Sequence, residues 1–294
     1  MSFQQIIPSI KRELWENEKS ILWLPTAIAG LMFLVTVSSW LLVPSFKVVG
    51  INSGSAGIDL SLFFTGMLFV ALLFIAIWVQ WHYFVSCLHD DRRDKSIFFW
   101  RSLPVSDALT VAIKLFVGAI IIPGAAILIS MVFSLVLALI VVVSAIFGFD
   151  ASVDFEWAKI LKEFTYLAYT LLNFLLYTLW IFPVYAWLML ASAFAKKAPS
   201  AWVILPVIIL LMIEAFAVDY LGIGSRFLFE SIKDYFSFEV GQGESSMLHL
   251  SILQNTKLDT LPNLLLAKIN LIPTLLGCGF MYLTYWLRVN RSQE

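Results

Sequence analysis

The run Asp90-Asp91-Arg92-Arg93-Asp94 is the part of this sequence whose residue types and spacing most directly suggest chemistry. On a helix, carboxylates at positions i and i+4 lie on the same face and can share a hard cation such as Mg²⁺, which can in turn hold a diphosphate. Such a site requires a second aspartate-rich segment that faces the first. The nearest match, Asp150 to Asp154, is expected on the opposite side of a membrane, so a magnesium-dependent enzyme is only the alternative hypothesis.

Two other sets of reactive residues do not predict a site. His82, Cys87 and His89 lie close together, but only the two histidines share a helix face, so we predict no metal site. No Ser or Cys nucleophile has a base at a recognisable spacing, and the phosphate-binding pattern G-x-x-x-x-G-K-[ST] does not occur in the sequence. We therefore predict no catalytic residue, no cofactor and no ATP-binding domain in this chain.

These residues must be positioned by a chain of 294 residues, of which 61% are hydrophobic and 13% are charged, with a mean hydropathy of +0.90. Soluble domains average about 45–50% apolar and about 25% charged residues, so the main solvent of this chain must be lipid. A net charge of −1 argues against a nucleic-acid binder, which relies on many phosphate contacts. Two cysteines, Cys87 and Cys278, are too few for a disulfide framework.

The apolar residues are concentrated in six stretches, each long enough to cross a bilayer core of about 30 Å. These predicted spans run approximately over Ile21 to Val43, Leu60 to Phe84, Leu115 to Phe147, Phe164 to Phe194, Ala201 to Val218 and Leu264 to Leu287. We therefore expect an all-α integral membrane protein with a single transmembrane domain over residues 1–294. Pro123-Gly124 and Pro183 are predicted to kink the long third and fourth spans.

The distribution of Lys and Arg predicts the orientation of the spans. Twelve of these residues fall in the N-terminus, the second and fourth loops and the C-terminus, and seven fall in longer segments on the other side. Because positive charge is enriched on the cytoplasmic side, both termini are predicted to be cytoplasmic. We expect a multi-pass protein of the cell's inner (plasma) membrane.

Two segments outside the spans are predicted to form amphipathic helices. Residues 1–20 repeat Ile and Leu at helical spacing, which predicts an elbow helix on the inner leaflet, with a short soluble helix as the alternative. Residues 219–263 form a long outer segment. Within it, Ser225 to Phe238 separate apolar from charged side chains, which predicts an interfacial or partly re-entrant helix.

Four polar residues within or beside the spans are candidates for a substrate path or its gating: Glu214, Asn173, Tyr177 and Lys268. A charge near the bilayer centre costs roughly 2.5–3.5 kcal/mol, so a carboxylate in a span is a functional hypothesis by default. Glu214 can pair with Lys268 at the start of the sixth span, or it can face an export path. Asn173 and Tyr177 share one face of the fourth span, which is either a seam against another helix or a wall of the path.

The predicted cytoplasmic loop, residues 86–114, holds nine of the chain's 39 charged residues around an aromatic group at 98–100. The loop breaks at Pro104, and Ser106 is placed to cap the helix that follows, with Asp107 in its first turn. Apolar and charged side chains presented together between two spans favour docking of a protein partner. A well-solvated turn is the alternative.

The loop carries the pattern Asp91-Arg-Arg-Asp94, Ser96-Ile and Phe99-Trp-Arg-Ser-Leu-Pro-Val-Ser-Asp107, followed by Lys114. This pattern resembles the cytoplasmic segment of ABC-2 family permeases, the membrane subunits of ATP-driven exporters. The N-terminal Lys11 to Glu16, followed by Leu24-Pro25, is similar to the elbow helix of that family. The resemblance implies six spans and a loop that forms a coupling helix seated in a separate ATP-binding subunit, which holds the ATP and Mg²⁺.

The resemblance assigns the contact with the ATP-binding subunit to Asp91, Arg92, Arg93, Asp94, Ser96, Phe99, Trp100, Arg101, Leu103 and Pro104. It also implies a second permease copy or a paralogue as partner, within membrane lipid. The few charges in the spans favour an amphipathic or hydrophobic cargo such as a lipid, peptide or drug. Two other functions stay open: an intramembrane prenyltransferase-like enzyme that uses Asp90, Asp91 and Asp94, and a membrane scaffold that transports nothing.

Overall fold

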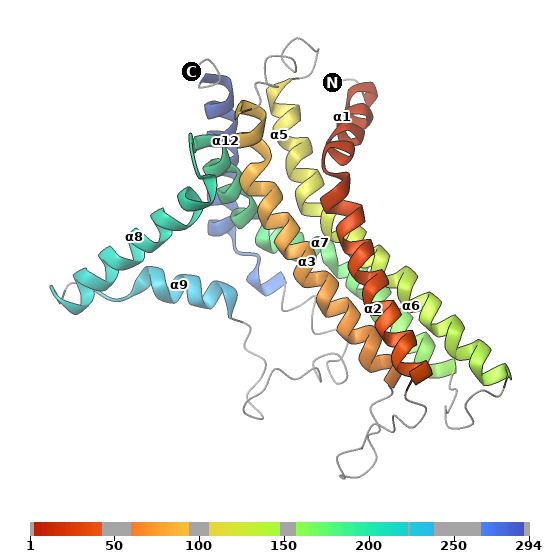
Figure 1. Ribbon diagram of the computed structural model, residues 1–294. Coiled ribbons are helices and arrows are strands. Elements are labelled where there is room, and N and C mark those ends of the chain that lie inside the picture. Colours follow the sequence, from red (N-terminus) through yellow and green to blue (C-terminus); the bar gives the residue numbers. More distant parts are fainter. Residues whose placement is uncertain are drawn as a thin grey trace. The chain divides into compact units, whose positions relative to one another are not determined.

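The computed structural model describes residues 3–42, 60–93, 106–147, 157–222, 224–237 and 266–290, and all regular secondary structure in these ranges is helical (Figure 1). In chain order the elements are α1 (Phe3–Glu16), the π-turn η1 (Lys19–Trp23), α2 (Leu24–Leu42), α3 (Leu60–Arg93), α5 (Asp107–Phe116), the π-turn η2 (Val117–Ile121), α6 (Ile122–Phe147), α7 (Trp157–Phe194), α8 (Pro199–Asp219), α9 (Phe227–Phe236) and α12 (Leu271–Asn290). The predicted all-α class is therefore confirmed for the described residues.

Five helical stretches are long and apolar enough to cross a membrane: Lys19–Ser38, Met67–Arg93, Asp107–Leu137, Asn173–Phe194 and Pro199–Asp219. They correspond to the first five predicted spans and indicate a multi-pass membrane protein. The helix expected as the sixth span, α12, is not among them, because two tyrosines, Trp286 and Arg288 lower its mean hydropathy. A sixth crossing stays a prediction.

The chain divides into two compact units, each built from segments that are distant in sequence. The first unit comprises Met1–His82 and Phe116–Phe174, and the second comprises Tyr83–Leu115 and Leu175–Glu294. Both α3 and α7 contribute residues to the two units.

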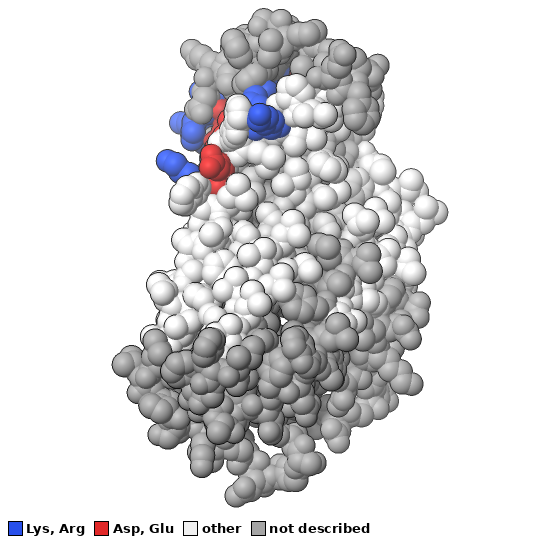
Figure 2. Space-filling view, turned by 90° about the vertical axis from the view of Figure 1, so that its right-hand side faces the viewer, with Lys and Arg blue, Asp and Glu red and all other residues white. Residues whose placement is uncertain are grey.

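The first unit packs α2 against α6. Ala29 of α2 forms a buried core with Leu68 and Leu72 of α3, and the ring of Phe33 meets that of Phe133 edge-on, with 5.9 Å between the centroids. On the face drawn in Figure 2, the charged side chains gather at one end, and the described surface beside them is uncharged. Such an uncharged surface is suited to contact with acyl chains.

The second unit brings α8 and α12 against the C-terminal half of α7. Trp187 of α7 donates from Nε1 to the carbonyl of Val203 in α8 at 3.2 Å, and its ring centroid lies 5.3 Å from that of Phe280 in α12. A Cβ on Gly277 of α12 would lie 2.8 Å from the ring of Phe182. A glycine at this position therefore lets α12 approach α7 closely.

Several local predictions can be compared with the helices. Helix α1 lies within the predicted elbow segment, and α9 lies within the segment predicted to form an outer helix, so these residues are helical. An elbow on the inner leaflet and a helix on the outer side both stay predictions. Pro123 follows the π-turn η2 closely, so the backbone departs from α-helical geometry at the predicted site. Pro183 lies inside α7, which continues as one helix to Phe194.

Candidate functional site

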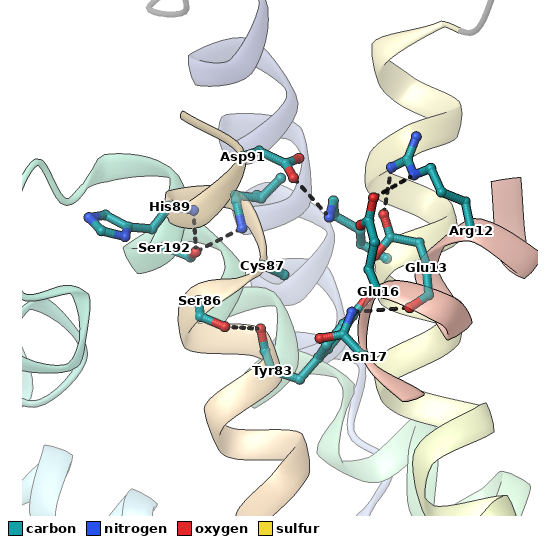
Figure 3. A network of polar contacts seen from close by, with 12 residues as sticks. Arg12, Glu13, Glu16, Asn17, Tyr83, Ser86, Cys87, His89, Asp91 and Ser192 are labelled. Carbon is teal, nitrogen blue, oxygen red and sulfur yellow. Dashed lines mark hydrogen bonds and ion pairs between the residues drawn. The ribbon is translucent and has the colours of Figure 1, made fainter. Parts of the chain in front are cut away.

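Charged side chains from three helices meet where α3 ends and α5 begins, at the two stems of the 86–114 loop. Asp91, in the last turn of α3 (labelled in Figure 3), lies 3.4 Å from Nζ of Lys114 in α5 and 3.2 Å from Nη1 of Arg288 in α12. Arg288 also donates from Nε to Oδ1 of Asp107, the first residue of α5, at 3.0 Å. We call these four residues the stem cluster.

The stem cluster is largely buried, and its formal charges cancel. The exposed fraction of the side chain is 10% for Asp91, 3% for Lys114 and 5% for Arg288. Two carboxylates face two cations, so each charge removed from water has a partner of opposite sign. Removal of one partner from such a buried pair typically costs about 3–5 kcal/mol, because the other charge is left buried without a partner.

Arg92 attaches the same end of α3 to the C-terminal end of α7. Its Nη2 donates to the carbonyls of Ser192 and Ala195, in each case at 2.8 Å. An α-helix leaves its last carbonyls without intrahelical donors, and a cation there also complements the helix dipole. The hydroxyl of Ser192 in turn accepts the amides of Leu88 and His89, each at 3.1 Å (Figure 3).

The start of α5 is fixed by a local cap. The hydroxyl of Ser106 accepts the amide of Leu109 at 3.3 Å, and Asp107 occupies the first turn. The cap that the sequence predicts at Ser106 is therefore confirmed. Both stems of the loop thus have a defined backbone position within the second unit.

Three of the ten residues predicted to contact an ATP-binding subunit lie in the described part of the chain. Asp91 and Arg92 are engaged by α12, α5 and α7 as given above, and the exposed side chain of Arg93 lies 3.5 Å from that of Asp90. Asp91 and Arg92 therefore hold the stems of the loop. The other seven residues, Asp94, Ser96, Phe99, Trp100, Arg101, Leu103 and Pro104, lie outside the described residues.

The contacts of the aspartate run make it poorly suited to a metal ion. Both carboxylate oxygens of Asp91 face cations, and Asp90 lies 3.3 Å from Nδ1 of His89 and 3.5 Å from Arg93. A hard cation needs carboxylate oxygens that are not already neutralised. Within the residues that the structure describes, no three His, Cys, Asp or Glu side chains form a group that could hold a metal.

Glu214 caps α9 and does not pair with Lys268. Its carboxylate accepts the amides of Leu228 and Phe229, the second at 2.9 Å, in the first turn of α9. These amides have no acceptor within their own helix, and the positive end of the helix dipole favours an anion there. Of the alternatives that the sequence left open for Glu214, pairing with Lys268 is not the contact observed, because the start of α9 supplies the donors. A role in a substrate path stays a prediction.

The C-terminal part of α9 is also attached. Lys268 donates to a backbone carbonyl in this part of α9, and the hydroxyl of Tyr235 donates to the carbonyl of Trp180 in α7. Burial raises the pKa of Tyr235 to about 12. Just before α9, a hydrogen bond and the charge of Asp219 raise the pKa of Arg226 above its usual value.

Asn173 and Tyr177 make contacts along their own helix, α7. Nδ2 of Asn173 donates to the carbonyl of Tyr169 at 2.9 Å, and the ring of Tyr177 meets that of Trp180 edge-on with 5.7 Å between centroids. These contacts are local, and a role for either residue in a substrate path stays a prediction.

Arg288 and Ser192 complete the site, although sequence reasoning did not identify either of them. Arg288 counts among the positive charges that predict orientation, and Ser192 is a small polar residue in an apolar stretch. The feature of the sequence that could have identified Arg288 is its position in the last turn of α12. A guanidinium there needs contact either with water or with an acidic side chain.

The chain matched nothing in three comparisons, with models of protein families, with curated proteins and with solved structures. The functional interpretation therefore depends on the residues and contacts described above.

Proposed function

We propose that this chain is the permease subunit of an ABC-2 type exporter, which moves substrate outward with ATP hydrolysed by a separate subunit. The observation that carries the proposal is the stem cluster, in which buried ion pairs join the two ends of the predicted coupling loop to α12. The proposal draws equally on the resemblance of the loop sequence to that family.

A docked subunit can move the spans only if the loop transmits its displacement to them. If the ends of the loop were not fixed to other helices, a displacement of the loop would change its own backbone conformation and would not reach the spans. Here Arg92 bonds one stem to α7, and Arg288 bonds both stems to α12. A push on the segment between residues 94 and 105 would therefore be passed to several helices at once.

The remaining parts of the proposal follow from the predicted topology. ATP and Mg²⁺ belong to the partner subunit, and a second copy of the chain or a paralogue completes the pathway. The N-terminal elbow helix lies on the inner leaflet with both termini cytoplasmic, and α9 belongs to the outer segment. The cargo is amphipathic or hydrophobic, because the spans contain few charges.

The membrane-enzyme alternative has less support. It needs Asp90, Asp91 and Asp94 to bind a metal together, whereas Asp91 is already neutralised by Lys114 and Arg288. The scaffold alternative predicts neither stimulation of ATP hydrolysis nor turnover of a prenyl diphosphate. One experiment therefore separates the permease, the enzyme and the scaffold hypotheses.

The test is co-purification of the full-length chain with candidate ATP-binding subunits, followed by an ATPase assay in lipid nanodiscs. We expect a stable complex whose ATPase rate exceeds that of the subunit alone. Trp100→Ala and Arg101→Glu should reduce both complex formation and the stimulation of ATPase. The matched control is Trp78→Ala, which removes a 70% exposed tryptophan from the apolar part of α3 and should change neither.

Three outcomes would contradict the proposal. Full assembly and stimulation with both loop variants would show that the loop is not the contact. Turnover of a prenyl diphosphate with Mg²⁺ and without a partner would favour the enzyme. Failure to retain any ATP-binding subunit, with no turnover, would favour the scaffold.

A further inference from the structure

Within the described residues, η1 and η2 stand at the same distance before a proline. η1 ends at Trp23, two residues before Pro25, and η2 ends at Ile121, two residues before Pro123. η1 and η2 are single turns of π-helix, with i to i+5 hydrogen bonds. π-Helices are rare and occur mostly as such one-turn bulges within α-helices, frequently at functional sites. The shared spacing has an explanation in the hydrogen bonds of the backbone.

In η2 the proline removes the donor that one carbonyl would need. The amide of Ile122 donates to the carbonyl of Val117, five residues earlier. The next carbonyl in this pattern belongs to Gly118, and its donor would be residue 123, but Pro123 has no N–H. Gly118 is buried, so water cannot easily replace the missing donor.

Gln80 of α3 supplies that donor. Its Nε2 donates to the carbonyl of Gly118 at 2.9 Å, and the residue is only 4% exposed. In η1 the carbonyl of Ser20 loses its donor in the same way at Pro25, but Ser20 is exposed and not buried in the protein. A side-chain donor is therefore found at the π-turn that is buried.

The bond between Gln80 and Gly118 lies within the first unit, beside two points where the chain passes between the units. α3 leaves the first unit after His82, and the chain returns to it at Phe116. Gln80 and Gly118 are each two residues from one of these points. Prolines and π-turns are recognised causes of helix bending, so a bend is favoured at the same place.

We propose that η2 is a hinge between α5 and α6, and that the Gln80 amide pins it. While the bond is made, the Gly118 carbonyl is satisfied and the π-turn is fixed relative to α3. When the bond is broken, that carbonyl must find another donor, which requires the backbone of η2 to rearrange. This inference does not rest on the proposed export function, because it concerns the purified chain alone.

The hydrogen-bond argument is tested by a double-mutant cycle on the full-length chain in detergent. Gln80→Leu should lower the apparent melting temperature by about 2–4 °C. Pro123→Ala gives residue 123 an amide, so in that background Gln80→Leu should cost less than half as much. Thr36→Val is the matched control, because it removes a 2.8 Å bond to the Met32 carbonyl, which lies one turn earlier within α2, and should have little effect.

An equal effect of Gln80→Leu in both backgrounds would overturn the assignment of Gln80 as the donor that replaces the Pro123 amide. If Gln80→Leu alone fails to fold, rescue of folding by Pro123→Ala supports the assignment, and failure of the double variant overturns it.

The hinge is tested by the distance between two spin labels, one in the unit that holds most of α5 and one in the unit that holds α6. The labels are placed at the exposed native Cys278 and at an Ile7→Cys substitution in α1, in a Cys87→Ala background diluted with unlabelled chain. Gln80→Leu should broaden the distance distribution, and Thr36→Val should leave it unchanged. If the double-mutant cycle shows coupling between Gln80 and Pro123 but the distance distribution does not change, Gln80 only caps the Gly118 carbonyl locally. That result would refute the hinge.

Discussion

Replacement of Arg288 by Met tests whether the stem cluster holds the loop. The change keeps an unbranched apolar stem but removes the guanidinium, which contacts Asp91 at 3.2 Å and Asp107 at 3.0 Å. The cluster then contains two carboxylates and one cation, Lys114. We expect the second unit to be destabilised and the loop stems to separate.

The magnitude follows from the burial of the partners. Loss of one member of a buried ion pair costs about 3–5 kcal/mol when the remaining charge has no other partner. Asp91 keeps Lys114 at 3.4 Å, and the side chain of Asp107 is 24% exposed at the start of a helix, so both carboxylates retain some stabilisation. We therefore expect about 3 kcal/mol, or roughly a hundredfold change in the unfolding equilibrium constant.

The assay is equilibrium unfolding of the purified chain in mixed micelles, with Arg93→Met as the control. Arg93 has a 63% exposed side chain in a 3.5 Å pair with Asp90, and exposed pairs contribute about 0–1 kcal/mol. Asp91→Asn in the Arg288→Met background should restore part of the loss, because it leaves one acid and one base. Equal costs for Arg288→Met and Arg93→Met, or additive costs in the double variant, would refute the reasoning.

Three further predictions concern the second unit. Glu214→Ala should destabilise the start of α9 by about 1 kcal/mol and speed hydrogen exchange of its first amides, since these lose their acceptor. Gly277→Ala should cost about 1–3 kcal/mol in thermal unfolding because its Cβ would lie 2.8 Å from the Phe182 ring, whereas Gly279→Ala faces open space and should be tolerated. The pKa of Tyr235 is raised from 10.0 to about 12, so its contribution to stability is full below pH 10 and is lost as pH rises to about 12. Tyrosinate absorbance compared with Tyr235→Phe measures this titration.

Features that depend on neighbouring residues could be predicted from the sequence. Five of the six expected spans appear as long apolar helices, because a continuous apolar stretch in lipid has to satisfy its backbone internally. The cap at Ser106 was predictable because its acceptor and donor lie within one turn. The helical conformation of α9 was predictable from the separation of its apolar and charged side chains.

Features that depend on pairing between distant segments could not be predicted. Arg288 and Asp91 are 197 positions apart, and Arg92 and Ala195 are 103 positions apart. Nothing in the spacing of single residues selects one such pair over another. Glu214 shows the same difficulty: its position in a span marks it as important, but its partners are backbone amides, which every helix start supplies.

The stem cluster also changes how the positive charges of the chain are interpreted. Lys114, Arg92 and Arg288 were counted as charges that predict orientation, yet each of them bonds to a carboxylate or a helix end within the second unit. These bonds require the end of α3, the start of α5 and the ends of α7 and α12 to lie together. These four helix ends therefore share one side of this unit, and the orientation that the charge count predicts stays a prediction. The positive charge at these helix ends therefore fixes the packing of the ends against one another as well as favouring one side of the membrane.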